Sequence, residues 1–198
     1  QLKVENKFID YFNENTEIYQ GMSLIDRELG GTTPIDIVLT LPEEKIIIDE
    51  DDFFFSEDSE VATYWWREKN MELLKSLKNS IDDVSGVGKV LSIANGVEFA
   101  ENLNDGFPIG EAGLVFLKNS LLENDQAEQI VDEYLSEDER STRISLRTVD
   151  SMNGLSRNEL LNEINAVLSA QLEGSNVSFY VSGLGVLYNN LLQSLFSS

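Results

Sequence analysis

The feature that most constrains the fold is a strand–helix–strand pattern that occurs twice. Apolar Ile35, Ile37 and Leu39 alternate with other side chains, as in a strand with one buried face. Hydrophobic spacing predicts a first unit with strands at 35–41 and 87–93 around a helix at 62–80, and a second with strands at 142–149 and 177–182 around a helix at 156–173. Two such units can interleave as a ferredoxin-like split β-α-β sheet with helices on one face, so we predict an α+β fold.

Further helices are expected outside these two units. Two precede the first strand, at 2–13 and 16–29, and Thr16 is suited to cap the second of them. Residues 95–140 indicate a helical insertion, with helices at 97–104, 111–122 and 125–135. A chain of 198 residues fits one domain, so we assign residues 1–198 to a single domain that carries these additions.

The charge balance excludes several kinds of partner. Acids outnumber bases by 36 to 14, which gives a net charge of −22. Nucleic-acid binding depends on cations that meet phosphates, so we predict no nucleic-acid partner. Docking on an anionic membrane through a basic patch is disfavoured for the same reason. The general interpretation of the acidity is solubility through self-repulsion, which also suits a saline habitat.

The sequence contains no pattern typical of an enzyme. With no Cys and no His, thiol nucleophiles, Cys/His zinc sites and Ser-His-Asp arrangements are excluded. Gly86-Val-Gly88 and Gly183-Leu-Gly185 complete neither a dinucleotide fingerprint nor a phosphate loop. Carboxylate pairs are expected by chance among so many acids. We therefore predict no catalytic residue, no cofactor and no enzyme activity.

Residues 43–61 form an acidic insertion with two embedded apolar triplets. Between Glu43 and Glu60 there are nine acids and the single base Lys45, and the second triplet is Phe53, Phe54 and Phe55. One interpretation is an exposed, solvated loop. The other is a calcium loop, since hard cations bind carboxylate oxygens, but the Gly expected at its sixth position is missing.

Two adjacent tryptophans, Trp65 and Trp66, begin the helix predicted at 62–80. At this spacing we expect one ring in the core and one at its edge. The alternative is that the two rings form a platform on which a sugar or a lipid stacks.

The end of the sequence resembles the beginning of a longer helix. After the strand that ends at Ser182, Leu184, Leu187, Leu191 and Leu195 follow helical spacing, with no Gly or Pro to stop the helix. We expect that the protein continues beyond residue 198. The chain has no apolar run of about 18 residues, so a membrane anchor would lie outside it.

Several motifs carry a resemblance to a known family. They are Asn6-Lys-Phe-Ile-Asp-Tyr-Phe12, Leu29-Gly-Gly31 before a strand that ends in Leu41-Pro42, Thr142-Arg-Ile-Ser-Leu-Arg147, and Gly183-Leu-Gly-Val-Leu-Tyr-Asn-Asn-Leu-Leu-Gln-Ser-Leu-Phe196. With these motifs the chain resembles the large extracytoplasmic loop of resistance-nodulation-division (RND) exporters. The similar branch is that of hydrophobe exporters related to the mycobacterial large membrane proteins. The start of the chain is more similar to the second of the two loops in such proteins than to the first.

The resemblance implies a porter domain in a proton-driven exporter of hydrophobic or amphiphilic, lipid-like molecules. The domain would lie on the extracytoplasmic side of a bacterial or archaeal cytoplasmic membrane. Its partners would be the membrane helices and the other porter loop of the same protein, and homo-oligomers are left open. The proton-relay residues of the family lie in membrane helices, so none is carried over to this chain.

The resemblance also suggests which residues would matter. Candidate substrate-path contacts are Trp65, Phe53, Phe54, Phe55 and Phe107, where they are exposed. The helix containing Leu184, Leu187, Leu191 and Leu195 would couple the domain to a membrane helix. The alternative function is a stand-alone extracytoplasmic ligand-binding or sensory domain with a ferredoxin-like sheet.

Overall fold

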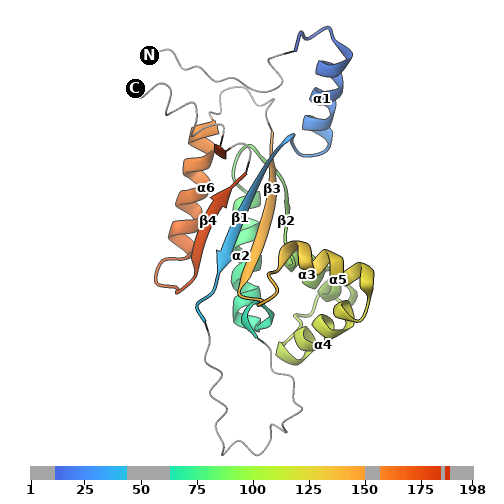
Figure 1. Ribbon diagram of the computed structural model, residues 1–198, viewed down its shortest axis with the longest axis vertical. Helices are drawn as coiled ribbons and strands as arrows, with labels where there is room; N and C mark the ends of the chain where they lie inside the picture. The colour runs from blue at the N-terminus through green and yellow to red at the C-terminus, as the bar shows by residue number, and fades with distance from the viewer. Residues whose placement is uncertain (1–11, 44–62, 150–156, 184–185, 188–198) are drawn as a thin grey trace, which may run out of the picture.

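The computed structural model describes residues 12–43, 63–149, 157–183 and 186–187 (Figure 1). Within these residues four antiparallel strands form one sheet in the order β2-β3-β1-β4. The strands are β1 (Thr33–Thr40), β2 (Val87–Leu91), β3 (Ser141–Thr148) and β4 (Ser178–Ser182). Helix α2 (Glu68–Asp82) connects β1 to β2, and helix α6 (Arg157–Gln171) connects β3 to β4. The predicted α+β fold with two interleaved β-α-β units is confirmed.

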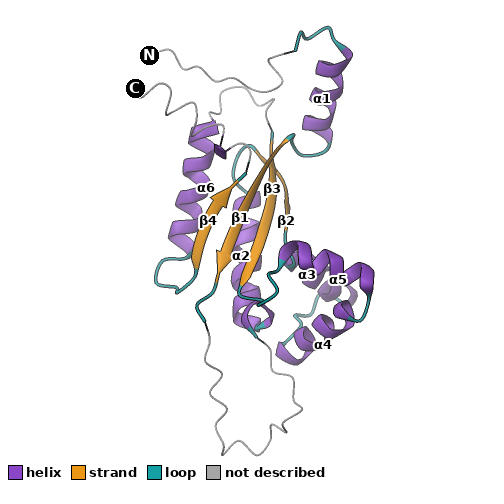
Figure 2. Cartoon of the chain, viewed as in Figure 1, coloured by secondary structure: helices purple, strands orange, loops and turns teal. Residues whose placement is uncertain are grey.

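One face of the sheet forms the core. Ile35 pairs with Leu146 and Ile37 with Ile144 across β1 and β3, and all four side chains are buried. Helix α2 lies behind the sheet and α6 packs against α2 (Figure 2). The buried residues of these helices are Met71, Leu74, Leu77, Lys78, Ile81, Leu160, Leu161, Ile164 and Leu168. The alternate positions of β1 and β3 are less buried, as period-two alternation predicts.

Helix α1 (Glu17–Glu28) lies at one end of the sheet (Figure 1). Its predicted cap is confirmed, since the Thr16 hydroxyl accepts the Tyr19 N–H at 3.2 Å. An apolar stripe of this kind normally faces a core, but here Ile18, Ile25 and Leu29 are exposed. The buried residue of α1 is Asp26, whose Oδ1 accepts a hydrogen bond from the Thr32 hydroxyl at 3.1 Å.

Glycines permit the close contact between α1 and the sheet. A β carbon on Gly88 would lie 1.8 Å from the Gly30 carbonyl oxygen, and one on Gly31 would lie 2.3 Å from the Thr148 oxygen. Gly31 also has φ of +107°, a conformation that other residues rarely adopt. The Lys89 N–H donates to the Gly30 oxygen at 3.3 Å. The end of α1 is thereby attached to β2 and β3.

Trp65 and Trp66 lie in a short 3₁₀ turn, η2 (Tyr64–Trp66), just before α2. Both are buried, with exposed fractions of 0% and 1%. The expectation of one core and one edge ring is therefore wrong, and no stacking platform is present at these two rings. The reason is that η2 packs against both α2 and α4. The Trp65 indole N–H donates to the Arg140 carbonyl at 2.9 Å.

The helical insertion lies at the end of the sheet away from α1 (Figure 1). Its helices are α3 (Ala94–Leu103), α4 (Glu111–Leu122) and α5 (Asp125–Tyr134), close to the predicted ranges. Two ion pairs, Lys75 with Glu101 and Lys78 with Glu98, join α3 to α2. The insertion is thus held to the core helix by charge as well as by apolar packing.

The chain enters and leaves the sheet at the same end. Asp36, near the start of β1, pairs with Ser182 at the end of β4. A β carbon on Gly183 would lie 2.8 Å from the Pro34 oxygen, and Gly183 has φ of +131°, so this turn favours glycine. The Leu187 N–H then donates to the Gly183 oxygen at 3.1 Å, which is the first turn of the expected helix.

Several predictions fall outside the described residues. They are the helix at 2–13 apart from its last two residues, the acidic insertion apart from Glu43, the calcium loop within it, Phe53, Phe54 and Phe55, and Leu184, Leu191 and Leu195. Among the helices that the structure does describe, none combines the length and the hydropathy needed to cross a bilayer.

Candidate functional site

A pocket of about 200 Å³ lies where the helical insertion meets α2. We call it the α2–α4 pocket. Helix α2 supplies one wall, and α3, the α3–α4 connection and the start of α4 supply the other. Its lining residues are Glu68, Met71, Glu72, Lys75, Glu101, Pro108, Ile109 and Leu114.

The pocket combines an apolar base with acidic walls. Met71 and Leu114 are each 1% exposed, so their side chains belong to the core and close the pocket from below. The wall carries the carboxylates of Glu68, Glu72 and Glu101 against the single ammonium of Lys75. With these four groups ionised, the wall has a net charge of −2. Such a site favours ligands that are apolar, or apolar with a positive group.

Glu101 ties three elements of the pocket together. The Lys75 Nζ lies 2.6 Å from both carboxylate oxygens of Glu101, and the Ile109 N–H donates to Oε1 at 3.1 Å. Burial alone would raise the pKa of the Glu101 carboxyl, but these hydrogen bonds and the charge of Lys75 outweigh it, so the pKa lies below its ordinary value. Lys75 is held as an ion-pair partner, so the arrangement favours binding over nucleophilic chemistry.

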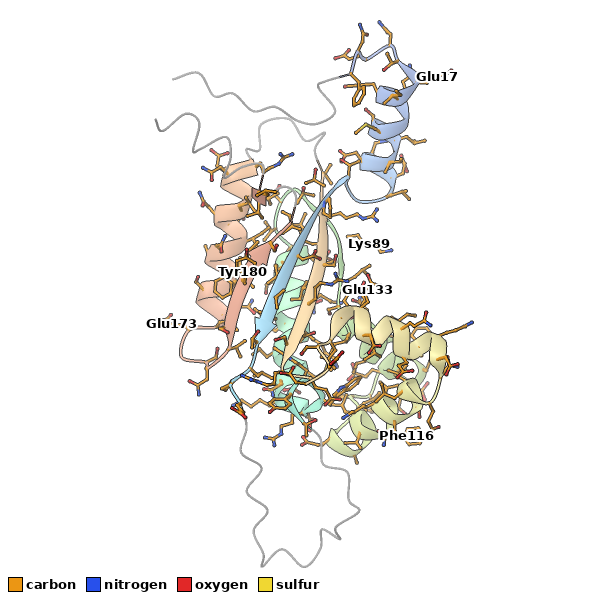
Figure 3. The ribbon with its side chains drawn as sticks, viewed as in Figure 1. Glu17, Lys89, Phe116, Glu133, Glu173 and Tyr180 are labelled. Carbon is orange, nitrogen blue, oxygen red and sulfur yellow. The ribbon has the colours of Figure 1, made fainter. Side chains whose placement is uncertain are left out.

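Exposed apolar side chains surround the helical insertion. Phe107, directly before Pro108 of the pocket, is 67% exposed. Phe99 and Leu103 are one turn apart on the outer side of α3. Phe116 points outward from α4 at the end of the molecule farthest from α1 (Figure 3). We call Phe99, Leu103, Phe107, Phe116 and Ile130 the distal apolar residues.

The predicted contact residues differ in their exposure to solvent. Phe107 is accessible and lies next to the pocket in the chain. Trp65 is completely buried, so it does not meet the condition of exposure under which it was a candidate contact. Leu187 is exposed. The three phenylalanines of the acidic insertion and the other three leucines of the closing helix lie outside the described residues.

Sequence reasoning did not find the pocket. The available signal was the spacing of Glu68, Glu72 and Lys75 by four and three residues, which places their side chains on one side of α2. This spacing alone resembles an ordinary solvated helix face. Only the position of α3 and the α3–α4 connection, set by the Glu101 contacts, makes it the wall of a pocket.

A second charged group lies on the face of the sheet opposite α2, the open face. The Arg143 guanidinium contacts Glu133 of α5 at 2.9 Å, lies 4.0 Å from the Asp36 carboxylate and is 5.3 Å from the centre of the Tyr134 ring. Burial raises the pKa of the Tyr134 hydroxyl, and the charge of Glu133 adds to this. These contacts join α5 to the central strands, so their role is structural.

The described residues include no group of three or more acids placed to hold a metal ion. Comparison with models of protein families gives no match for this chain, and no curated protein matches it in sequence. The function must therefore be inferred from the fold, the pocket and the exposed side chains.

Proposed function

We propose that this chain is the extracytoplasmic porter domain of a proton-driven RND-type exporter, where it forms part of the path of hydrophobic or amphiphilic substrates. The observation that carries the proposal is the sheet topology. Two interleaved β-α-β units give the order β2-β3-β1-β4, and the chain enters and leaves this sheet at one end, where Asp36 pairs with Ser182. Such an arrangement suits a domain inserted between two membrane helices, because both connections leave the sheet at the same end.

The arrangement also supports transmission of motion. Strands β1 and β4 are hydrogen-bonded neighbours, so segments attached to them at this end would move the sheet as one body. The rigid core on the other face transmits this displacement to α2, and the ion pairs of α2 transmit it to the helical insertion. A movement near the membrane would thus reach the α2–α4 pocket.

The distal apolar residues and the pocket favour an apolar cargo. The five distal apolar residues are large side chains exposed on the helical insertion, and they are available to contact other apolar groups. The base of the pocket, Met71 and Leu114, is apolar, and the exposed Phe107 directly precedes the lining residue Pro108 in the chain. The isolated domain would form only part of a path, and the rest would come from the membrane helices and the other porter loop.

The test uses the full-length protein in proteoliposomes, with proton-driven efflux of a fluorescent hydrophobic dye as the measurement. Replacing Phe107 with Ala should lower efflux several-fold without lowering the thermal midpoint, because this side chain is mostly exposed. Tyr180→Ala is the matched control. Tyr180 is also an aromatic residue with 67% exposure, but it lies on β4, away from the helical insertion (Figure 3).

Three outcomes would contradict the proposal. The first is a gene that encodes no run of about twenty apolar residues on either side of this segment. That result would favour a stand-alone ligand-binding or sensory domain. The second is an intact protein whose efflux does not depend on a proton gradient. The third is an equal effect of Phe107→Ala and Tyr180→Ala on efflux.

A further inference from the structure

Lys89 and Arg147 lie side by side on the open face of the sheet. Val87 pairs with Thr148 and Val90 with Leu146, so a bulge in β2 places Gly88 and Lys89 opposite Arg147. Both basic side chains are exposed, and Lys89 lies beside β2, between α1 and the helical insertion (Figure 3). Side chains in this relation have β carbons about 5 Å apart, close enough for both to contact one small anion.

These two cations have no acidic partner among the described residues, although acids exceed bases by 36 to 14 in the chain. Four other bases are paired with acids: Lys75 with Glu101, Lys78 with Glu98, Lys118 with Glu139 and Arg143 with Glu133. Like charges on neighbouring strands repel each other, so the pair costs stability unless an anion lies between them.

Acids on the neighbouring elements have other partners: Glu28 of α1 contacts Arg27 at 2.8 Å, and Glu133 of α5 contacts Arg143 at 2.9 Å. Asp36, on the next strand, lies 4.0 Å from the Arg143 Nε. Asp26 is buried and accepts a hydrogen bond from Thr32. The remaining negative charge of the domain acts at longer range, where salt at about 0.15 M screens it beyond roughly 8 Å.

The exposed stripe of α1 ends close to the backbone of Lys89. Ile18, Ile25 and Leu29 are spaced by seven and four residues, so they share one side of the helix, and all three are exposed. Leu29 is followed by Gly30, whose carbonyl accepts the Lys89 N–H at 3.3 Å. Through this backbone contact the apolar stripe leads to two cations that have no acidic partner among the described residues, and such a combination is the complement of an anionic amphiphile.

We propose that Lys89 and Arg147 bind the anionic head of an amphiphile whose apolar chain lies along Ile18, Ile25 and Leu29. Arg147 offers a planar fork of donors to a phosphate or carboxylate, and Lys89 adds a point charge. This inference deepens the proposed function, on which its biological role rests, because it names the charge of an amphiphile held at this surface. The surface is separate from the α2–α4 pocket, whose acidic wall favours apolar ligands or apolar ligands with a positive group. It also revises, for this one surface, the expectation that an acidic domain avoids anionic lipids.

Binding is measured on the 198-residue chain by titration with dodecanoyl lysophosphatidylglycerol, which is anionic, and with the zwitterionic lysophosphatidylcholine of the same acyl chain, both below their micelle concentrations. The anionic probe should bind more tightly. Lys89→Gln and Arg147→Gln should each weaken it about tenfold, since each removes a charge-assisted hydrogen bond, and should leave the zwitterionic probe almost unchanged. Leu29→Ser should weaken both probes.

Lys69→Gln is the matched control, because Lys69 is also exposed and has no partner among the described residues but lies on α2. It should not change binding. Equal affinity for the two probes would overturn the proposal, and so would an anionic affinity that survives the combined Lys89→Gln and Arg147→Gln change. Inorganic phosphate could bind as tightly as the anionic lipid, and Leu29→Ser could leave lipid binding unchanged. These two results together would overturn the proposed amphiphile ligand and indicate a site for free phosphate. Thermal midpoints close to that of the unaltered chain show that each variant is folded.

The assay separates this inference from the proposed function. Binding to the chain without efflux by the intact protein would leave the lipid site standing and contradict the exporter. Proton-driven efflux without preference for the anionic probe would contradict the lipid site alone.

Discussion

Trp65 and Trp66 provide an internal comparison for the value of one buried hydrogen bond. The two residues are adjacent in η2, and both are essentially inaccessible to solvent. The indole N–H of Trp65 donates to the Arg140 carbonyl at 2.9 Å, whereas that of Trp66 is buried and has no acceptor among the described residues. Replacing each in turn with Phe removes the same atoms from the same region of the core.

The expected difference in the free energy of unfolding between the two variants follows from the hydrogen bonding of the two indole N–H groups. Loss of the Trp65 bond should cost about 1 kcal/mol and not more, because the Arg140 oxygen keeps its bond from the Leu41 N–H at 3.0 Å. Loss of the unpaired Trp66 N–H should recover about 1 to 3 kcal/mol of desolvation penalty. The cavity left by the smaller ring lowers stability in both variants and largely cancels in the comparison. Trp65→Phe should therefore be less stable than Trp66→Phe by about 2 to 4 kcal/mol.

The free energy of unfolding is measured by urea titration followed by far-ultraviolet circular dichroism, since tryptophan fluorescence differs between the variants. Equal denaturant slopes would show that the two variants unfold to similar states. If Trp65→Phe is as stable as Trp66→Phe, or more stable, the hydrogen bond to Arg140 does not make the stated contribution.

Two further changes test the contacts that position α1 and the pocket. Gly88→Ala should lower stability by about 2 to 4 kcal/mol, because its β carbon would lie 1.8 Å from the Gly30 oxygen and displace the Lys89–Gly30 hydrogen bond. Gly21→Ala, inside α1 with no atom within 4 Å, should instead add about 0.5 to 1 kcal/mol, and urea midpoints that fall equally would refute the steric account. The lowered pKa of Glu101 means that its stabilisation is fully present above the ordinary value of 4.5 and is lost as the pH falls through the lowered pKa. The stability difference between the unaltered chain and Glu101→Gln should thus be constant near neutral pH and shrink below pH 4.5, and a difference independent of pH would refute it.

The sequence predicted the regular elements because their signals are local. Alternation at Ile35, Ile37 and Leu39 indicates a strand whatever it pairs with, and the order of strands and helices restricts how two β-α-β units can interleave. The helices of the insertion were predicted to within a few residues for the same reason.

The sequence did not predict which apolar surfaces would be covered. Ile18, Ile25 and Leu29 have the spacing of a core-facing stripe, yet the Gly30–Gly88 contact fixes α1 with Asp26 inward. One of the rings of Trp65 and Trp66 was expected at the edge of the core, but both are buried, because their environment depends on α4, which lies more than forty residues later in the chain. The Lys89–Arg147 pair depends on a bulge in β2 that leaves no local signal beyond Gly88 itself.

The sheet order also determines when the protein can fold during synthesis. Strand β1 hydrogen-bonds only to β3 and β4 within the described sheet, and β3 begins at residue 141. A ribosome therefore releases β1 about a hundred residues before its first partner exists. Contacts of such long sequence separation fold slowly, because the loop must be closed before any bond is gained. In the interval the apolar face of β1 is exposed as an unpaired strand, so this domain should depend on chaperones, or on an early contact with α2, more than its size alone suggests.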